Sequence, residues 1–295
     1  MAGVKKEVWL NVVADKFTHT SKFLAEVQDY SEHVENDVIH MSEIGADPAV
    51  LINHTGNVPV SAMADADIPV PLVRFDTENT KVTAAELNAI SYDKISKVTD
   101  KHVRAIESKA LEYAAIALAP TNHTAETPFL ETTGSVVGGV KAITRSDIIR
   151  LKSAFDDLGI PDDGRVLVLT KTHYNQLVET DDLFKSQTLK PNASDGMIEY
   201  YGFNLYSYGK NPYYERIAAN NYSKLPYGGV PGANHRRASF AYHKSMAMKA
   251  GGTMQLFMSE ADKSPETREN VLGMRKNFVA RSIIQYALGV IFPGV

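Results

Sequence analysis

The stretch Ser91–Leu118, SYDKISKVTDKHVRAIESKALEYAAIAL, carries the strongest periodic pattern in the sequence. Side chains on one stripe recur every three or four positions: Ile95, Val98, His102, Ile106, Ala110, Tyr113 and Ala117. This spacing predicts a single long amphipathic helix. Ser91 caps its start and Pro120 ends the pattern, so at about 1.5 Å per residue the helix would be roughly 40 Å long. An element of that length spans an entire subunit.

Two β-prone pieces precede this helix within Ile68–Thr83, IPVPLVRFDTENTKVT. The polar cluster Asp76–Thr80 separates them and suits the tip of a hairpin. Pro69 and Pro71 restrict the first piece to the edge of a sheet, because proline has no N–H to donate to a strand ladder. The sequence therefore predicts a long exposed hairpin, which we assign to residues 56–90.

The N-terminal segment has the pattern of short amphipathic helices followed by extended chain. Apolar side chains, among them Trp9 and Phe17, recur every three or four residues in its first half. Asp37–Thr55 then holds two short β-like pieces separated by a glycine and a proline. This pattern favours an arm, residues 1–55, over a compact unit, and such an arm needs a partner surface.

Helix and strand patterns alternate behind the long helix. Thr144–Pro161 has an N-cap threonine, an aspartate in the first turn and Gly-Ile-Pro as its stop, which predicts a helix. Arg165–Thr170, RVLVLT, fits a buried strand, and THYNQLVET after it fits a short helix. Met197–Tyr208 reads as strand, turn and strand. We group residues 91–208 into one domain that includes the long helix at 91–118.

The remaining segment, residues 209–295, begins with polar chain and ends in β-prone pieces. Gly209–Arg237 is rich in Tyr, Asn, Gly and Pro and has little periodicity, which predicts a long loop of the kind that carries function or an interface. Between Ala238 and Phe292, three β-prone pieces surround an acidic turn near Glu260–Asn270. The whole pattern predicts an α+β fold.

Composition places the 295-residue chain among ordinary globular proteins, with 44% hydrophobic and 22% charged residues. Its 31 basic and 35 acidic residues give a formal net charge of -4, and no stretch concentrates Lys and Arg as a nucleic-acid-reading face requires. The absence of cysteine excludes disulfides, thiolate zinc sites and a cysteine nucleophile. We expect no membrane contact and an intracellular origin, because there is neither a signal-peptide pattern nor an apolar run of roughly 18 to 20 residues.

No motif anchors a catalytic, cofactor or metal site. The glycine doublets lack the spacing of a phosphate loop, the histidines lack ligand spacing with a carboxylate, and there is no Gly-x-Ser-x-Gly elbow. We therefore expect no enzyme, no cofactor and no metal. The one compact basic cluster is His235-Arg236-Arg237, which either faces nucleic acid or, in our preferred interpretation, forms surface salt bridges.

The order of these elements resembles the Hong Kong 97-type fold of tailed-bacteriophage major capsid proteins. That family has an N-terminal arm, an extended two-stranded loop, a spine helix, a peripheral domain and an axial domain, and the chain has a candidate for each. Val73–Pro120 looks like the loop and spine helix of coat proteins from phages that infect Bacteroidetes-type hosts. Gly164–Phe184 looks like the peripheral-domain strand and helix, and Tyr200–Tyr208 like the strand that follows. By this resemblance, 91–208 is the peripheral domain and 209–295 the axial domain.

The resemblance implies a structural protein that self-assembles as hexamers and pentamers into an icosahedral shell. The shell would enclose double-stranded DNA without sequence-specific binding. A portal and scaffolding or decoration proteins would be its other partners. Assembly in the host bacterial cytoplasm and a final place in the virion capsid follow from the same resemblance.

A projecting hairpin and an arm leave unpaired edges and apolar side chains that only neighbouring copies can cover. The expected contact residues therefore come from the arm, the hairpin and the polar loop: Trp9, Phe17, Arg74, Phe75, Asp76, Glu78, Lys81, Tyr213, Tyr214, Tyr227, Arg236 and Arg237.

Two alternatives stay open. An encapsulin-like nanocompartment shell protein shares the fold and encloses cargo protein in place of DNA. A soluble α+β enzyme would build its site from dispersed residues such as His173, Tyr174 and Asp182.

Overall fold

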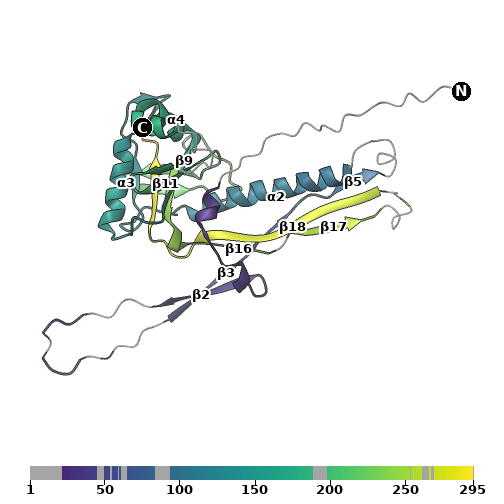
Figure 1. Cartoon of the computed structure of the whole chain (residues 1–295), viewed down its shortest axis with the longest axis horizontal. Helices are drawn as coiled ribbons and strands as arrows, with labels where there is room; N and C mark the ends of the chain where they lie inside the picture. The colour runs from purple at the N-terminus through teal and green to yellow at the C-terminus, as the bar shows by residue number, and fades with distance from the viewer. Residues whose placement is uncertain are drawn as a thin grey trace.

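The computed structural model describes residues 22–44, 50–53, 55–58, 60, 65–83, 94–188, 198–252, 254–260, 266 and 269–294. They form a compact lobe, an elongated layer of one helix on a sheet, and a narrow two-stranded projection (Figure 1). The mixture of helices and strands confirms the α+β class. Trp9, Phe17 and the expected N-cap Ser91 lie outside the described residues.

The elongated part packs α2 (Lys94–Leu118) against a six-stranded sheet (Figure 1). α2 has 25 residues, so at about 1.5 Å per residue it is roughly 37 Å long, close to the prediction. His102, Ile106 and Ala110 of the predicted stripe are buried. Ala110 and its neighbour Ala114 meet Phe278 in a shared core cluster. Small side chains thus let the helix lie close to the sheet.

The central strand of this sheet is β18, and each of its edges carries an interrupted partner strand. The strands are β18 (Glu269–Ser282), β16 (Ala247–Gly251), β17 (Gln255–Ser259), β4 (Val73–Asp76), β5 (Thr80–Thr83) and β1 (Gln28–Asp29). β16 and β17 pair antiparallel along one edge of β18, and β4 and β5 pair antiparallel along the other. β1 pairs in parallel with β16.

The prediction that Asp76–Thr80 forms a hairpin tip is wrong. β4 and β5 run in the same direction along β18, and the residues between them form an irregularity in one long edge. Thr77 keeps the chain in register, since its N–H donates to Met274 O and its Oγ1 accepts from Met274 N, both at 2.9 Å. Gly273 leaves room opposite, because a Cβ there would lie 2.2 Å from Asn79 Oδ1. The polar cluster is accommodated within the sheet rather than at a turn.

The two-stranded projection uses earlier residues than predicted. β2 (Val38–Ile44) pairs antiparallel with β3 (Asp65–Pro71), with Val38 opposite Pro71 and Ile44 opposite Asp65. Both strands are edges, so the prolines of β3 are accommodated as the sequence predicted. In Figure 1 this pair extends away from the lobe and from α2.

A mixed sheet of six strands forms the centre of the lobe. Its order is β10 (Ile198–Tyr200), β11 (Phe203–Tyr208), β9 (Arg165–Thr170), β15 (Ser239–His243), β19 (Leu288–Phe292) and β6 (Phe129–Glu131). All of β9 is buried, as the continuous Val/Leu run predicted. The sheet draws strands from both 91–208 and 209–295, the segments that the sequence analysis assigned to separate domains.

The side chains of β9 alternate between two cores. On one face, Leu167 and Leu169 join the cluster formed by the helices of the lobe. These helices are α3 (Arg145–Asp157), α4 (Lys171–Thr180) and α5 (Asp182–Thr188). On the other face, Val166 and Val168 pack with Phe23 and the end of α2. The lobe and α2 therefore share one continuous core.

The local signals in this part of the sequence are confirmed. Thr144 and Asp147 form the capping box of α3. The β10–β11 turn has positive φ at Tyr201 and Gly202. Gly138 and Gly139, both with positive φ, form the turn between β7 (Val136–Val137) and β8 (Val140–Lys141).

The prediction of an irregular loop over Gly209–Arg237 is wrong in part. β12 (Tyr213–Ala218) pairs with β13 (Asn221–Lys224) and with β14 (Arg236–Arg237) in a small antiparallel sheet. The strands are short and largely exposed, and only Tyr214 and Tyr222 are buried, so apolar alternation is too weak to detect. None of the helices in the described ranges is long and apolar enough to cross a membrane.

Candidate functional site

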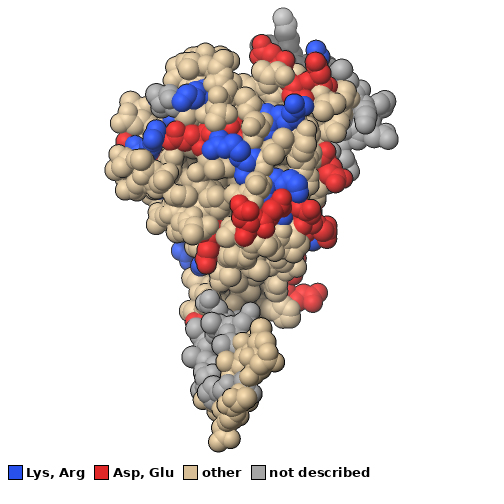
Figure 2. All heavy atoms as spheres, turned by 90° about the vertical axis from the view of Figure 1, so that its left-hand side faces the viewer, with Lys and Arg blue, Asp and Glu red and all other residues tan. Residues whose placement is uncertain are grey.

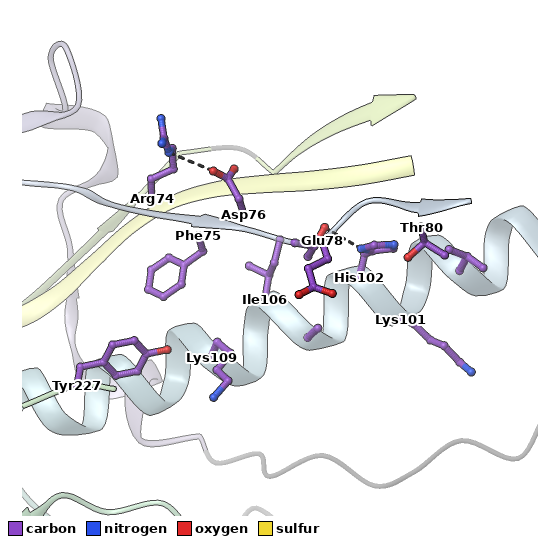
Figure 3. Close-up of a pocket in the computed structure, with 13 residues that line it drawn as sticks. Arg74, Phe75, Asp76, Glu78, Thr80, Lys101, His102, Ile106, Lys109 and Tyr227 are labelled. Carbon is purple, nitrogen blue, oxygen red and sulfur yellow. Dashed lines mark hydrogen bonds and ion pairs between the residues drawn. The ribbon is translucent and has the colours of Figure 1, made fainter. Parts of the chain in front are cut away.

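A groove of about 610 Å³ lies between β4 and α2, and Figure 3 shows the side chains along it. Predicted contact residues from two distant segments line it together: Arg74, Phe75, Asp76, Glu78 and Tyr227. The opposite wall is the face of α2 that carries His102 and Ile106. The structure thus brings together residues that the sequence had indicated separately.

Aromatic side chains hold one end of the groove. Phe75 meets Tyr113 of α2 edge to face, with ring centroids 5.7 Å apart and an interplanar angle of 72°. Tyr113 meets Tyr227 in the same way, at 5.5 Å and 85°. Such pairs contribute on the order of 0.5–1.5 kcal/mol each beyond burial. The loop that carries Tyr227 is thereby fixed on the helix.

Charged side chains fix the rim. Arg275 holds Asp76 through two hydrogen bonds of 2.6 and 3.3 Å, and Arg74 lies 3.1 Å from the same carboxylate. The hydrogen bond from Arg275, followed by the charges of both arginines, lowers the pKa of Asp76. Deeper in the groove, His102 Nδ1 lies 2.8 Å from Thr77 Oγ1, which also bonds β18. The groove is therefore a preformed surface with an apolar floor and a charged rim, as protein contact sites often have.

The other predicted contact residues lie elsewhere. Lys81 forms an ion pair of 3.2 Å with Glu269 of β18. Arg237 stacks on Tyr213, with its guanidinium carbon 4.8 Å from the ring centroid. Arg236 and Arg237 donate to backbone carbonyls, and within the described residues neither forms the surface salt bridge expected of that cluster.

Tyr214 is not a surface residue, and its assignment as a contact is corrected. Its side chain is fully buried in the core of the lobe, and its hydroxyl donates to Pro120 O at 2.6 Å. Burial raises the pKa of this hydroxyl well above its usual range. The two adjacent tyrosines of β12 looked equivalent in the sequence, but period two places Tyr213 and Tyr214 on opposite faces of the strand.

The apolar side chains at the end of the β2–β3 projection were not predicted as contact residues. Val50, Ile52, Val58 and Val60 are each more than two-thirds exposed, with Val60 at 99%. Figure 2 shows uncharged side chains at this end, whereas acidic and basic side chains are interspersed over the lobe above it. The available signal was the run LINHTGNVPV, whose apolar residues have no helical or strand period. Contiguous exposed apolar side chains of this kind mark contact sites.

The residues named for an enzyme do not converge. His173 and Asp182 line different pockets. Tyr174 packs edge to face on Phe184, with centroids 5.3 Å apart. No group of metal-binding side chains occurs among the residues described.

Sequence comparison and structure comparison give different outcomes. No protein-family model and no curated protein sequence matches the chain. Solved structures match over nearly its whole length. The capsid of cyanophage P-SCSP1u aligns with 97% of this chain and 92% of its own, at 12% identity and a TM-score of 0.66. The capsid of Ralstonia phage GP4 covers 99% and 96%, at 9% identity and a TM-score of 0.66. The capsid of Myoviridae phage XM1 covers 100% of both chains, at 11% identity and a TM-score of 0.62.

The chain has the fold of phage capsid proteins. This confirms the resemblance to the Hong Kong 97-type capsid fold that the order of elements predicted. At sequence identities of 9–12%, these matches show a shared fold only. The expected host group stays a prediction. In this capsid fold, the groove on α2 and the exposed apolar side chains at the end of the β2–β3 projection are the two candidate contact surfaces.

Proposed function

We propose that this chain is the major capsid protein of a tailed phage. Its copies form hexamers and pentamers, which close into an icosahedral shell around double-stranded DNA. The observation that carries this proposal is the capsid fold over the whole chain. The formal net charge of -4 suits a shell that encloses DNA without binding it tightly.

The subunit is incomplete by itself, which supports assembly. An isolated two-stranded ribbon is at best marginally stable in water, yet β2 and β3 project without a third strand in the described chain. Apolar side chains at the end of the projection have no cover within the same subunit. A neighbouring copy that packs on the projection would both stabilise the two-stranded ribbon and cover its apolar side chains.

The groove on α2 is the surface that we assign to this neighbour. Its floor is apolar around Phe75 and Ile106, and its volume of about 610 Å³ accommodates several side chains. The projection points away from α2 in its own subunit, so the contact must form between copies (Figure 1). Contact between two different surfaces of identical chains is heterologous, and it closes into rings when the rotation permits.

The domain plan follows with adjusted boundaries. We place the extended loop at β2–β3, residues 38–71, rather than at 56–90. The peripheral domain is α2 with the β18 sheet, and the axial domain is the lobe, because each of these units has its own sheet. A portal, scaffolding or decoration proteins and the packaged DNA are the further partners, and the virion is the final location after assembly in the bacterial cytoplasm.

The test is to express the full chain and to examine it by light scattering and negative-stain electron microscopy. Closed shells, or rings of five and six, are the expected result. A monodisperse monomer at every concentration and salt condition would overturn the proposal. The nucleic acid and protein that copurify with shells then separate the two shell types, since a nanocompartment retains a cargo protein.

A further inference from the structure

A small pocket of about 220 Å³ lies beyond the C-terminal ends of three strands of the six-stranded sheet in the lobe. β9, β11 and β19 all end on this side, because β11 is parallel to β9 and β15 is antiparallel to both β9 and β19. The residues that follow these strands, Lys171, Gly209 and Pro293, line the pocket. α4 begins here, so the positive end of its dipole points toward the same space. Crevices beyond the carboxyl ends of parallel strands commonly bind ligands.

Cationic residues from three segments line the pocket: Lys141 of β8, Lys171 of α4, and Arg236 with Arg237 of β14. No Asp or Glu is among the lining residues, and none of these cations forms an ion pair in the described chain. Their bonds go to neutral groups, as from Lys171 Nζ to Ser207 Oγ at 2.7 Å. In a protein with net charge -4, this uncompensated positive charge is a local exception that an anion would neutralise.

A buried histidine supplies an independent observation. His173 lines the pocket although it is only 2% exposed, and its Nδ1 lies 2.7 Å from Ser239 Oγ. Its Nε2 has no hydrogen-bond partner among the described residues. Ser239 Oγ already accepts the N–H of Thr170. When the hydroxyl donates to Nδ1, the neutral ring carries its proton on Nε2, as a donor to a ligand.

We propose that this pocket binds a phosphate group, either free or on a nucleic-acid backbone. Lys141, Lys171, Arg236 and Arg237 neutralise its charge, and His173 Nε2 donates a hydrogen bond. Phosphate fits because it accepts several charge-assisted hydrogen bonds at once, and arginine presents paired donors to two of its oxygens. Burial lowers the pKa of His173 to about 4, against the opposing effect of Asp147, so the ring is a neutral donor at pH 7.

The test variant is Lys141→Gln, because in the described structure this side chain makes no hydrogen bond or ion pair whose loss would disturb the fold. Inorganic phosphate is titrated calorimetrically into the unassembled full-length subunit in chloride buffer. The wild type shows saturable binding at one site, and Lys141→Gln weakens it about tenfold, since one charged hydrogen bond is lost. Lys185→Gln removes the same charge from the exposed face of α5 and leaves the binding unchanged.

Two further measurements complete the test. When His173 Nε2 donates to phosphate, its resonance in the nitrogen spectrum of the histidine rings shifts on titration, and an unchanged resonance at saturating phosphate overturns the role of His173. Short duplex DNA is titrated in parallel. Binding of DNA but not of inorganic phosphate, weakened by Lys141→Gln alone, assigns the site to the nucleic-acid backbone. Absence of saturable binding of both ligands, or equal binding by wild type and Lys141→Gln, overturns the proposal.

Discussion

Lys224 illustrates at the residue scale how a charge is used inside the lobe. Its ammonium donates to Ile116 O at 3.0 Å and to Ala119 O at 2.7 Å, at the C-terminal end of α2. These bonds satisfy carbonyls that no helical N–H reaches, and a cation at this end also suits the helix dipole. Burial nevertheless lowers the pKa of this lysine from 10.5 to about 8. The residue thus joins β13 to the long helix at an electrostatic cost.

This cost predicts a distinctive pH dependence of stability. Between pH 8 and pH 10.5 the unfolded chain keeps the proton that folded Lys224 has lost, so stability contributed by this group rises with pH. Buried tyrosines such as Tyr242, whose pKa is raised well above 10, oppose this above pH 10. The measurement is urea unfolding of the unassembled subunit at pH 8, 9 and 9.5.

We expect Lys224→Met to flatten the rise, which for one group is at most about 1.4 kcal/mol per pH unit. Lys185→Met, an exposed lysine of α5, serves as the control and keeps the wild-type slope. Equal slopes in the wild type and Lys224→Met would mean that Lys224 stays protonated on folding.

Among the secondary-structure elements, the capping box of α3 links the start of this helix to residues just after β6. Asp147 is fully buried and accepts from Thr144 N and Thr144 Oγ1, both at 2.9 Å, and from Thr133 Oγ1 at 2.7 Å. Arg150 on the next turn lies 3.3 Å from the same carboxylate. The aspartate therefore ties the start of α3 to the chain that follows β6.

Thr144→Ala is expected to destabilise the subunit by about 1.5–3 kcal/mol, because the buried carboxylate of Asp147 loses the hydroxyl that donates to it. Ser146→Ala, at the second position of α3, is the matched control and should change the free energy of unfolding by less than about 0.5 kcal/mol. Denaturant unfolding measures both. Equal effects of the two variants would assign no role to the cap.

The elements also show what the sequence could predict. α2, α3, α4 and β9 follow from local periodicity and caps, and all were predicted. The path of β4 and β5 was not, because it is set by pairing with a strand almost 200 residues later, through bonds such as Met274 N to Thr77 Oγ1. The contact residues that line the groove were predicted one by one. They meet because Tyr113 contacts both Phe75 and Tyr227, and the position of Tyr113 in the periodic pattern of the helix does not indicate which residues it contacts.

At the scale of the whole molecule, the two contact surfaces face different directions, and this decides what a mutation at either one should do. The end of the projection is an exposed apolar surface, and Ile52 is 84% exposed. Ile52→Asp removes no packing from the subunit, so its folding should match that of the wild type. In our proposal this side chain enters the groove of a neighbour, where a buried and unpaired carboxylate is costly.

We therefore expect Ile52→Asp to give soluble subunits with wild-type thermal unfolding that assemble at least about tenfold less well, since burying an apolar side chain of this size is worth more than about 1.4 kcal/mol. Light scattering at matched concentrations measures assembly. Val230→Asp is the control, because Val230 is 87% exposed and does not line the groove. If both variants assemble like the wild type, the projection does not insert into a neighbour. If both fail, exposed apolar side chains act over the whole surface, and the groove on α2 has no special part in closing the shell.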